Sequence, residues 1–442
     1  MAKNQSEGLK RELGVLDVAV NVINISIASG IFLLPAIIAG ILGNASIAAY
    51  ILCGCMFLLV TLCYAEVSSR VTTSGGAYAY IEKAFGAYAG FIANTLFWFG
   101  TGVLVSAALI NGIADMLSVP FSFFSRPLYR GLLFIMLFAC FAYINIIGGK
   151  KSMTVIKIIT FVKVLPLVVL VTVGLFNVNT NNLHWEGFPA FDKLGAASII
   201  LFFAFAGGET ALNTSGEMKN PKRTAPLGLM LGVIILVVFY SLIQIVAQST
   251  LGESLNHQKA PLAAVAGTLL GSWGTKMLIA CGVLAIAGSL YSVVFVFSRV
   301  LFAGANDGLL PGFLSVVHPR YATPYWAIIT LSIIAFLMAI SGGFKQLLVL
   351  ATISLLLLYA GVVLAVIKFR LKRGTEYPAT FILPGGLSIP VITLIIIIWF
   401  LFQSKSNEVL SLGIFLSLLS IVYMIKIFLA KRRLAINNVK AL

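Results

Sequence analysis

The feature that most constrains this chain of 442 residues is the repetition of long apolar stretches separated by short polar turns. Hydrophobic residues make up 60% of the sequence and charged residues only 10%, which is more apolar surface than a soluble fold can bury. A helix needs about 20 mostly apolar residues to cross a bilayer, and the stretches repeatedly reach that length. They lack the two-residue alternation of a transmembrane β-strand. The chain is therefore predicted to be an all-α integral membrane protein.

These stretches predict twelve transmembrane helices. Their ranges are 17–40, 46–66, 88–117, 128–148, 152–176, 194–215, 226–249, 276–303, 324–340, 346–367, 384–403 and 408–429. If the amino terminus is cytoplasmic, most basic clusters fall on the cytoplasmic side, in agreement with the positive-inside rule. These clusters are Lys10-Arg11, Lys150-Lys151, Lys219 with Lys222-Arg223, Lys368 to Arg373, and Lys431-Arg432-Arg433. Topology and anionic lipid headgroups thus explain the net charge of +16, and no nucleic-acid partner is expected.

Two predicted helices contain small residues where a membrane helix should be continuous, namely Ala28-Ser29-Gly30 in the first span and Gly207-Gly208-Glu209 in the sixth. Paired breaks of this kind are typical of transporters that bind a small substrate near the bilayer midplane. The first ten spans would then form a 5+5 inverted repeat, followed by two extra helices. The expected parts are a cytoplasmic amino terminus (1–16), the two repeats (17–176 and 194–367), a cytoplasmic loop with spans eleven and twelve (368–429), and a cytoplasmic tail (430–442).

The small residues of the first break favour binding of a carboxylate. Ser26, Ala28, Ser29 and Gly30 lie at mid-depth in the span. If the helix unwinds near Ser29 and Gly30, the second half-helix presents unpaired N–H groups and its positive dipole end to the substrate. The alternative is that these small residues only allow close packing against a neighbouring helix.

The second break combines aromatic residues, two glycines and an acid. Unwinding near Gly207 would expose carbonyl groups that accept hydrogen bonds from a substrate ammonium, and Phe203 or Phe205 could cover the site. Glu209 is costly inside a membrane and is expected to face the bundle interior or water, paired or protonated. Its alternative role is a structural hydrogen bond to nearby backbone.

Three further charged residues are candidates for coupling and gating. Lys163 lies deep in the fifth span, where burial disfavours the charged form of an amine and makes Lys163 a candidate proton carrier. Alternatively, it stays charged and fixes the broken first helix or snorkels. Glu66 and Arg70 are four residues apart and form a candidate inner gate, or else a solvated pair on one helix face.

The sequence contains no pattern that indicates catalysis or a metal site. All five cysteines, Cys53, Cys55, Cys63, Cys140 and Cys281, fall in apolar stretches with no histidine beside them, so they are interpreted as packing residues. No Ser/His/Asp set or nucleotide motif occurs at membrane depth. We therefore expect neither an enzyme nor a bound cofactor, with the proton as the expected coupling ion.

Several motifs in order along the chain resemble the amino acid-polyamine-organocation superfamily of permeases. They are Ala28 to Phe32, Ala65 to Arg70 followed by Thr73 to Tyr78, Phe203 to Glu209 followed by Lys219 to Arg223, Ser298-Arg299, Asp307 to Pro311, and Thr323-Pro324. The resemblance implies the inverted five-plus-five fold, alternating access, and an amino-acid site between spans one, three, six, eight and ten. It also implies a bacterial cytoplasmic membrane as the location.

The same resemblance implies roles for individual residues. Ser26, Ala28, Ser29 and Gly30 would surround the substrate carboxylate, and Phe203, Ala204, Phe205 and Gly207 would lie nearer its amine and side chain. Lys163 matches the lysine that replaces a sodium ion in proton-coupled members, whereas Glu209 matches a glutamate of basic amino acid and polyamine exchangers.

The chain departs from arginine exchangers at two positions, where it has Val105 and Val293 in place of asparagine and tryptophan. We therefore expect proton-coupled uptake of amino acids, with amino acid or amine exchange as the alternative and a non-transporting sensor as a third reading. The sequence leaves the particular substrate and the oligomeric state open.

Overall fold

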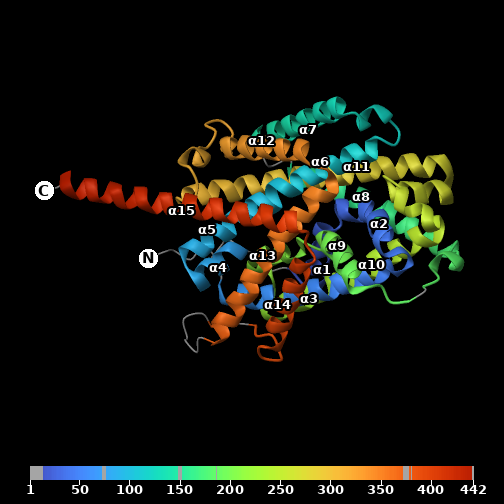
Figure 1. Ribbon diagram of the computed structural model, residues 1–442, viewed down its shortest axis with the longest axis horizontal. Coiled ribbons are helices and arrows are strands. Elements are labelled where there is room, and N and C mark those ends of the chain that lie inside the picture. The colour runs from blue at the N-terminus through green and yellow to red at the C-terminus, as the bar shows by residue number, and fades with distance from the viewer. Residues whose placement is uncertain are drawn as a thin grey trace.

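The structure, a computed structural model, describes residues 13–71, 76–147, 152–185, 187–371, 378–379 and 381–440. Within these ranges the chain forms helices and connecting turns, with one isolated β-bridge between Leu13 and Met218 (Figure 1). The all-α fold predicted from the sequence is therefore confirmed. Residues 1–12 of the predicted amino terminus, residues 72–75 of the second motif and residues 441–442 of the tail lie outside the described ranges.

The α-helices are α1 (Val15–Ser26), α2 (Ser29–Leu42), α3 (Ser46–Arg70), α4 (Ala77–Phe85), α5 (Ala87–Thr95), α6 (Val105–Leu117), α7 (Pro127–Ile147), α8 (Ser152–Phe176), α9 (Phe191–Leu201), α10 (Pro221–Leu251), α11 (Pro261–Asn306), α12 (Tyr325–Ser341), α13 (Phe344–Leu371), α14 (Ser388–Phe402) and α15 (Ser406–Lys440). The 3₁₀ segments are η1 (Gly43–Ala45), η3 (Ser122–Ser125), η4 (Thr180–Leu183), η5 (Phe202–Ala204), η6 (Gly208–Glu217), η7 (Gly252–His257) and η8 (Gly312–Ser315). The segment η2 (Leu96–Leu104) is a π-helix.

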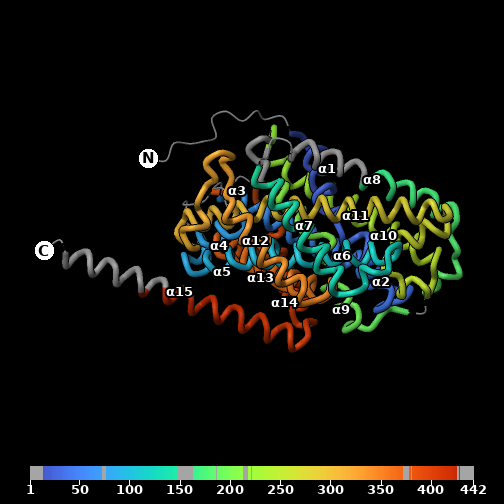
Figure 2. The backbone as a smooth tube through the Cα atoms, turned by 90° about the horizontal axis from the view of Figure 1, so that it is seen from above, coloured from blue at the N-terminus to red at the C-terminus, as the bar shows by residue number. Residues whose placement is uncertain are grey.

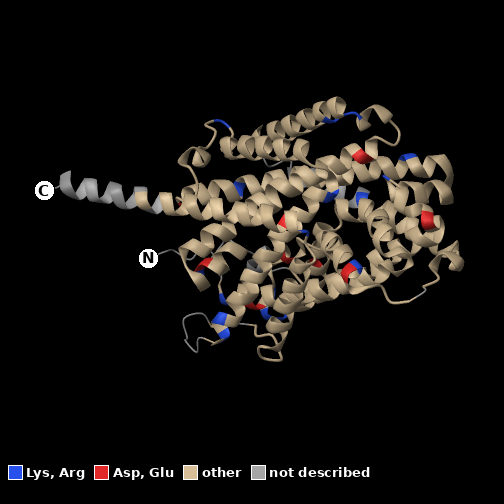
Figure 3. Cartoon of the chain, viewed as in Figure 1, with Lys and Arg blue, Asp and Glu red and all other residues tan. Residues whose placement is uncertain are grey.

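Eight helical stretches in the described part of the chain are long and apolar enough to cross a membrane. They are Ser29–Arg70, Ala87–Leu117, Pro127–Ile147, Phe191–Leu212, Lys222–His257, Pro261–Asn306, Phe344–Leu371 and Ser406–Ile425. Four shorter apolar helices are Val15–Ser26, Lys163–Phe176, Tyr325–Ser341 and Ser388–Phe402. Figure 3 shows long stretches of these helices without a charged residue, as a lipid environment requires.

The helices pack as two groups. In the first group, α10 contacts α1 and α3, while α9 contacts α2 and α3. In the second group, α11 contacts α6 and α12, and α12 lies beside α7 (Figure 1). Helix α13 contacts members of both groups, and α15 runs along the outside of the body (Figure 2). Apart from α13, α2 and α8 make the main contacts between the groups, each packing against α11.

Two glycines four residues apart bring α10 close to α1. A Cβ atom added at Gly228 would lie 2.5 Å from Cβ of Val18, and one added at Gly232 would lie 2.8 Å from Cβ of Val22. Both distances are shorter than real Cβ contacts, so these positions tolerate only glycine without a shift. Small residues at this spacing let membrane helices associate through backbone contact. Helix α1, the first half of the broken first span, therefore packs directly on α10.

We expect Gly232→Leu to destabilise the protein, because the added side chain must push α1 away from α10. Overpacking of this kind costs about 1–3 kcal/mol, so the midpoint of thermal unfolding in detergent should fall. Gly413→Leu on α15 is the matched control, since a Cβ atom there meets nothing within 4 Å. Equal unfolding midpoints for the two variants would show that the close contact of Gly228 and Gly232 with α1 does not stabilise the protein.

Candidate functional site

The first break lies between α1 and α2. Ile27 (φ −71°, ψ 87°) and Ala28 (φ −127°, ψ −148°) have non-helical backbone angles, whereas Ser29 and Gly30 already belong to the first turn of α2. The N-cap residue Ala28 has no side chain that can cap the helix. The N–H groups of the first turn of α2, at the positive end of its dipole, are therefore available to an anion.

Gly30 serves the contact between the two breaks and not the unwinding itself. A Cβ atom added at Gly30 would lie 2.8 Å from Cβ of Ala204, so the two broken helices touch at this point. Beside this contact, the hydroxyl of Ser29 is fully buried and has no hydrogen-bond partner. The first break thus offers an unsatisfied donor together with the uncapped N–H groups.

The second break uses its two glycines for different purposes. Helix α9 tightens into η5, turns through residues 205–207 and continues as η6. Gly207 has φ +101°, a left-handed conformation that L side chains rarely adopt. A Cβ atom at Gly208 would lie 3.1 Å from Oγ of Ser26. The first glycine permits the turn, and the second permits close approach to α1.

Hydrogen bonds join the two breaks. The hydroxyl of Ser26 donates to the carbonyl oxygen of Phe205 at 3.2 Å. The buried hydroxyl of Tyr240 on α10 lies 2.8 Å from the carbonyl oxygen of Ser26 and 3.1 Å from that of Ala204, and its single proton is shared between the two. A carbonyl released by a broken helix is costly inside a membrane unless it is paired. Tyr240 therefore stabilises both interruptions at once.

Lys163 contacts the carboxyl end of α1. Its Nζ atom donates to the carbonyl oxygen of Asn24 at 2.7 Å, and the residue is only 7% exposed. Asn24 lies in the last turn of α1, where the helix dipole is negative and a cation is favoured. The amine of Lys163 is thus positioned to sense the state of the first break.

Glu209 satisfies the backbone of its own break. Its Oε2 atom accepts a hydrogen bond from the N–H of Gly207 at 2.9 Å, and the residue is buried. The hydroxyl of Tyr359 on α13 lies beside the Glu209 carboxyl group but does not reach regular hydrogen-bond geometry. Glu209 therefore connects the second break to α13.

The aromatic residues of the second break are placed differently. The ring of Phe205 packs in the core, with its centroid 5.2 Å from that of Tyr240 and 6.4 Å from that of Phe57. Phe203 is only partly buried. Of the two rings suggested by the sequence, Phe203 is the more accessible.

The predicted pair Glu66 and Arg70 is brought together, but away from the breaks. Nη2 of Arg70 lies 2.9 Å from Oε1 of Glu66, near the end of α3. The same carboxylate also accepts from Nε of Arg370 at 2.9 Å and from the N–H of Leu383 at 2.9 Å. Sequence reasoning had assigned Arg370 only to a basic cluster of the topology, so its contact with Glu66 was missed.

Tyr240 was also missed, although a pattern in the sequence pointed to it. Tyr240, Gln244 and Gln248 recur at four-residue spacing within an otherwise apolar helix, so they share one face of α10. The amide of Gln244 donates to the carbonyl of Pro35, and that of Gln248 donates to the carbonyl of Gly43. This face of α10 therefore supports α2 from Pro35 to its carboxyl end.

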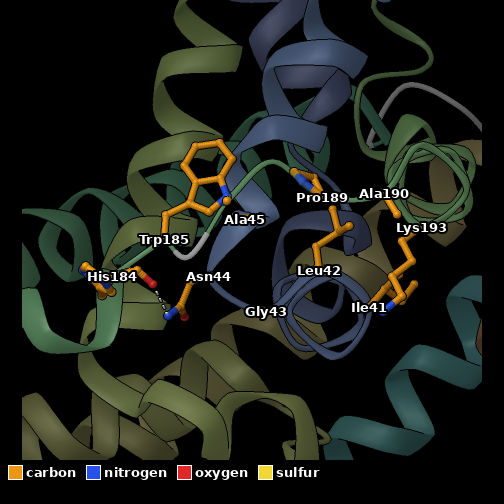
Figure 4. A pocket seen from close by; sticks show the side chains of 11 residues that line it. Ile41, Leu42, Gly43, Asn44, Ala45, His184, Trp185, Pro189, Ala190 and Lys193 are labelled. Carbon is orange, nitrogen blue, oxygen red and sulfur yellow. Dashed lines mark hydrogen bonds between the residues drawn. The ribbon is translucent and has the colours of Figure 1, made fainter.

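A cavity of about 410 Å³ lies at the opposite ends of α2 and α9 from the breaks (Figure 4). Residues 41–45 form one wall, and residues 184–193 contribute the other, including Trp185 and Lys193. The side-chain amide of Asn44 donates to the carbonyl of His184 at 2.7 Å across it. The cavity is thus separate from the breaks.

Comparison with known proteins places the sequence of this chain in a family. The family model described as amino acid permease matches residues 13–438. The methylthioribose transporter of Bacillus subtilis is 26% identical over 99% of this chain and 97% of its own length. The serine/threonine exchanger SteT of the same organism is 29% identical over 82% of this chain and 83% of its own. The branched-chain amino acid permease BcaP of Bacillus subtilis is 26% identical over 91% of this chain and 89% of its own length. The chain therefore belongs to the amino acid permease family, whose members are membrane transporters and not enzymes.

Proposed function

We propose that this protein is a secondary active transporter that takes up amino acids together with protons by alternating access. The observation that carries the proposal is the contact between two broken helices, with an uncapped helix N-terminus on one side and the buried lysine Lys163 at the other end of the same break. The N–H groups of Ser29 and Gly30 bind the substrate carboxylate. Phe203, Ala204, Phe205 and Gly207 lie nearer its amine and side chain.

The names of the relatives include both neutral and charged substrates. Three bacterial relatives are named for methylthioribose, for serine and threonine, and for branched-chain amino acids, whereas two relatives from Arabidopsis thaliana are named cationic amino acid transporters. In this chain, Val105 is buried and Val293 is partly buried, and neither offers a polar group to a charged side chain. We therefore propose neutral amino acids as the substrate class.

The helix packing supports alternating access through a rocking motion. The group around α10 contains both broken helices, and the group around α11 forms the second body. The apolar helices overlap the expected spans, with Val15–Ser26 and the beginning of Ser29–Arg70 together falling in span one. We infer that they form two inverted five-helix repeats plus two extra helices, with both termini cytoplasmic.

Uptake into proteoliposomes tests this function directly. Each of the twenty radiolabelled L-amino acids is offered under an inward proton gradient, with no amino acid inside. Accumulation above the outside concentration supports symport, whereas flux that requires preloaded amino acid supports exchange, as in the relative named a serine/threonine exchanger. Binding without flux in either format would identify a sensor and contradict the proposal.

Lys163→Ala is expected to abolish accumulation driven by the proton gradient while some binding remains. The substitution removes the amine from the carbonyl of Asn24, so protonation no longer changes the first break. Uptake with and without the gradient is compared in proteoliposomes. Lys193→Ala at the exposed outer cavity is the control and should behave as the parent. Unchanged dependence on the gradient in Lys163→Ala would remove this residue from the coupling mechanism.

Glu209→Gln separates charge from geometry at the second break. A glutamine oxygen still accepts the N–H of Gly207, so the turn persists while the titratable group is lost. We expect a folded protein whose transport responds differently to pH, measured as uptake between pH 5 and pH 8. Glu253→Gln in the exposed η7 serves as the control. Intact affinity and an unaltered pH profile would reduce Glu209 to a packing residue.

Tyr240→Phe removes the hydroxyl that is shared by the two breaks. The carbonyls of Ser26 and Ala204 lose a buried donor, which costs about 1–3 kcal/mol, so substrate affinity should fall about tenfold. Thermal shift with the transported amino acid measures this affinity. Tyr88→Phe, which loses only an exposed contact with Ser420, is the control. Equal substrate affinities of Tyr240→Phe and the unsubstituted protein would show that the Tyr240 hydroxyl does not influence the binding site.

A further inference from the structure

A buried carboxylate joins three segments at the end of α3 remote from the outer cavity. Glu66 is fully buried and pairs with Arg70 on its own helix. Its other partners are Arg370 in the last turn of α13 and the backbone of Leu383, which precedes α14. Glu66 is thus a centre on which separate elements converge.

The segment from Phe381 to Gly386 is attached to this centre through polar groups. The hydroxyl of Ser69 lies 3.1 Å from the carbonyl oxygen of Phe381 and 3.2 Å from its N–H. Arg370 in turn donates to the carbonyl oxygens of Leu383, at 3.0 Å, and of Gly386. The guanidinium therefore holds the segment and the carboxylate together.

Arg70 and Arg370 have different mechanical roles. Arg70 is four residues from Glu66 on one helix, so this pair persists however the helices move. Arg370 belongs to α13, so its contact breaks when α13 separates from α3. Water that enters such an opening resolvates both charges and recovers their desolvation cost. An ionic contact between α3 and α13 is therefore better suited to repeated opening than a contact between apolar side chains, which water does not stabilise when they separate.

We propose that Glu66 and Arg370, with the segment Phe381–Gly386, form a latch that closes the cytoplasmic end of the transport path and opens in every cycle. The proposal rests on the transport function above. The basic cluster that contains Arg370 places this end in the cytoplasm by the positive-inside rule. Arg70 belongs to the fixed half of the latch, and Arg370 belongs to the moving half.

Cys63 is a native reporter for the latch. It is fully buried one turn before Glu66, with its Sγ atom 4.0 Å from Oγ1 of Thr393 on α14. In a variant whose other four cysteines are replaced by alanine, alkylation by N-ethylmaleimide measures how often this end opens. We expect Glu66→Gln and Arg370→Lys to raise the alkylation rate about tenfold, because each leaves a buried charge poorly paired.

A control variant makes the reporter decisive. Asp115→Asn, which breaks the pair with Arg130, should leave the alkylation rate of Cys63 unchanged. Alkylation rates of Glu66→Gln and Arg370→Lys equal to that of the unsubstituted protein would overturn the proposal.

A reversible cross-link tests the latch with its charges intact. Cysteines replacing Ser69 and Phe381 in a cysteine-free background are joined by a short methanethiosulfonate linker. Uptake of labelled L-serine or L-leucine should stop and return after reduction, whereas undiminished uptake by the linked protein would refute an opening latch. If the parent itself carries neither amino acid nor any of the others, the transport function fails instead, and the Cys63 rates still decide the latch.

Discussion

The structure depends on one constraint, which is that every backbone group released by a broken membrane helix needs a partner inside the protein. The chain meets it with side chains placed at the interruptions. Tyr240 and Ser26 bind released carbonyls, Lys163 binds the end of α1, and Glu209 binds the N–H of Gly207. The N–H groups at the start of α2 have no side-chain cap. The proposed binding site is therefore the part of the breaks that the protein's own side chains leave unpaired.

Helix α10 supports the broken first helix along its entire length. Its glycines receive α1 by close backbone contact, Tyr240 holds the interruption, and two glutamines hold α2. These contacts recur at multiples of four residues, so they follow a row that winds gradually around α10. A single continuous helix thus keeps two half-helices aligned although the chain between them is not helical. This support explains how α1 and α2 keep a fixed position relative to each other across the break.

The sequence predicts this fold well because its strongest signals are local. Apolar length indicates the helices, and the glycine pair at Gly207 and Gly208 indicates the second break. The first break lies at Ile27 and Ala28 and not near Ser29 and Gly30 as predicted. Gly30 is needed for contact with Ala204 and not for unwinding. Tyr240 and Arg370 were missed because their partners are backbone atoms or residues 36 to 304 positions away. Such contacts depend on which helices become neighbours, which local patterns do not encode.

The contact between Gly30 and Ala204 has a consequence for selectivity. The two broken helices approach so closely that even a Cβ atom at Gly30 would clash with Ala204, so a substrate that binds between the breaks as proposed must push them apart. Such a pocket would select a substrate by how far the substrate separates the two helices, and not by a preformed shape. In the proposed transport cycle both half-helices belong to the body that rocks, so the size of the substrate and the position of that body would change together.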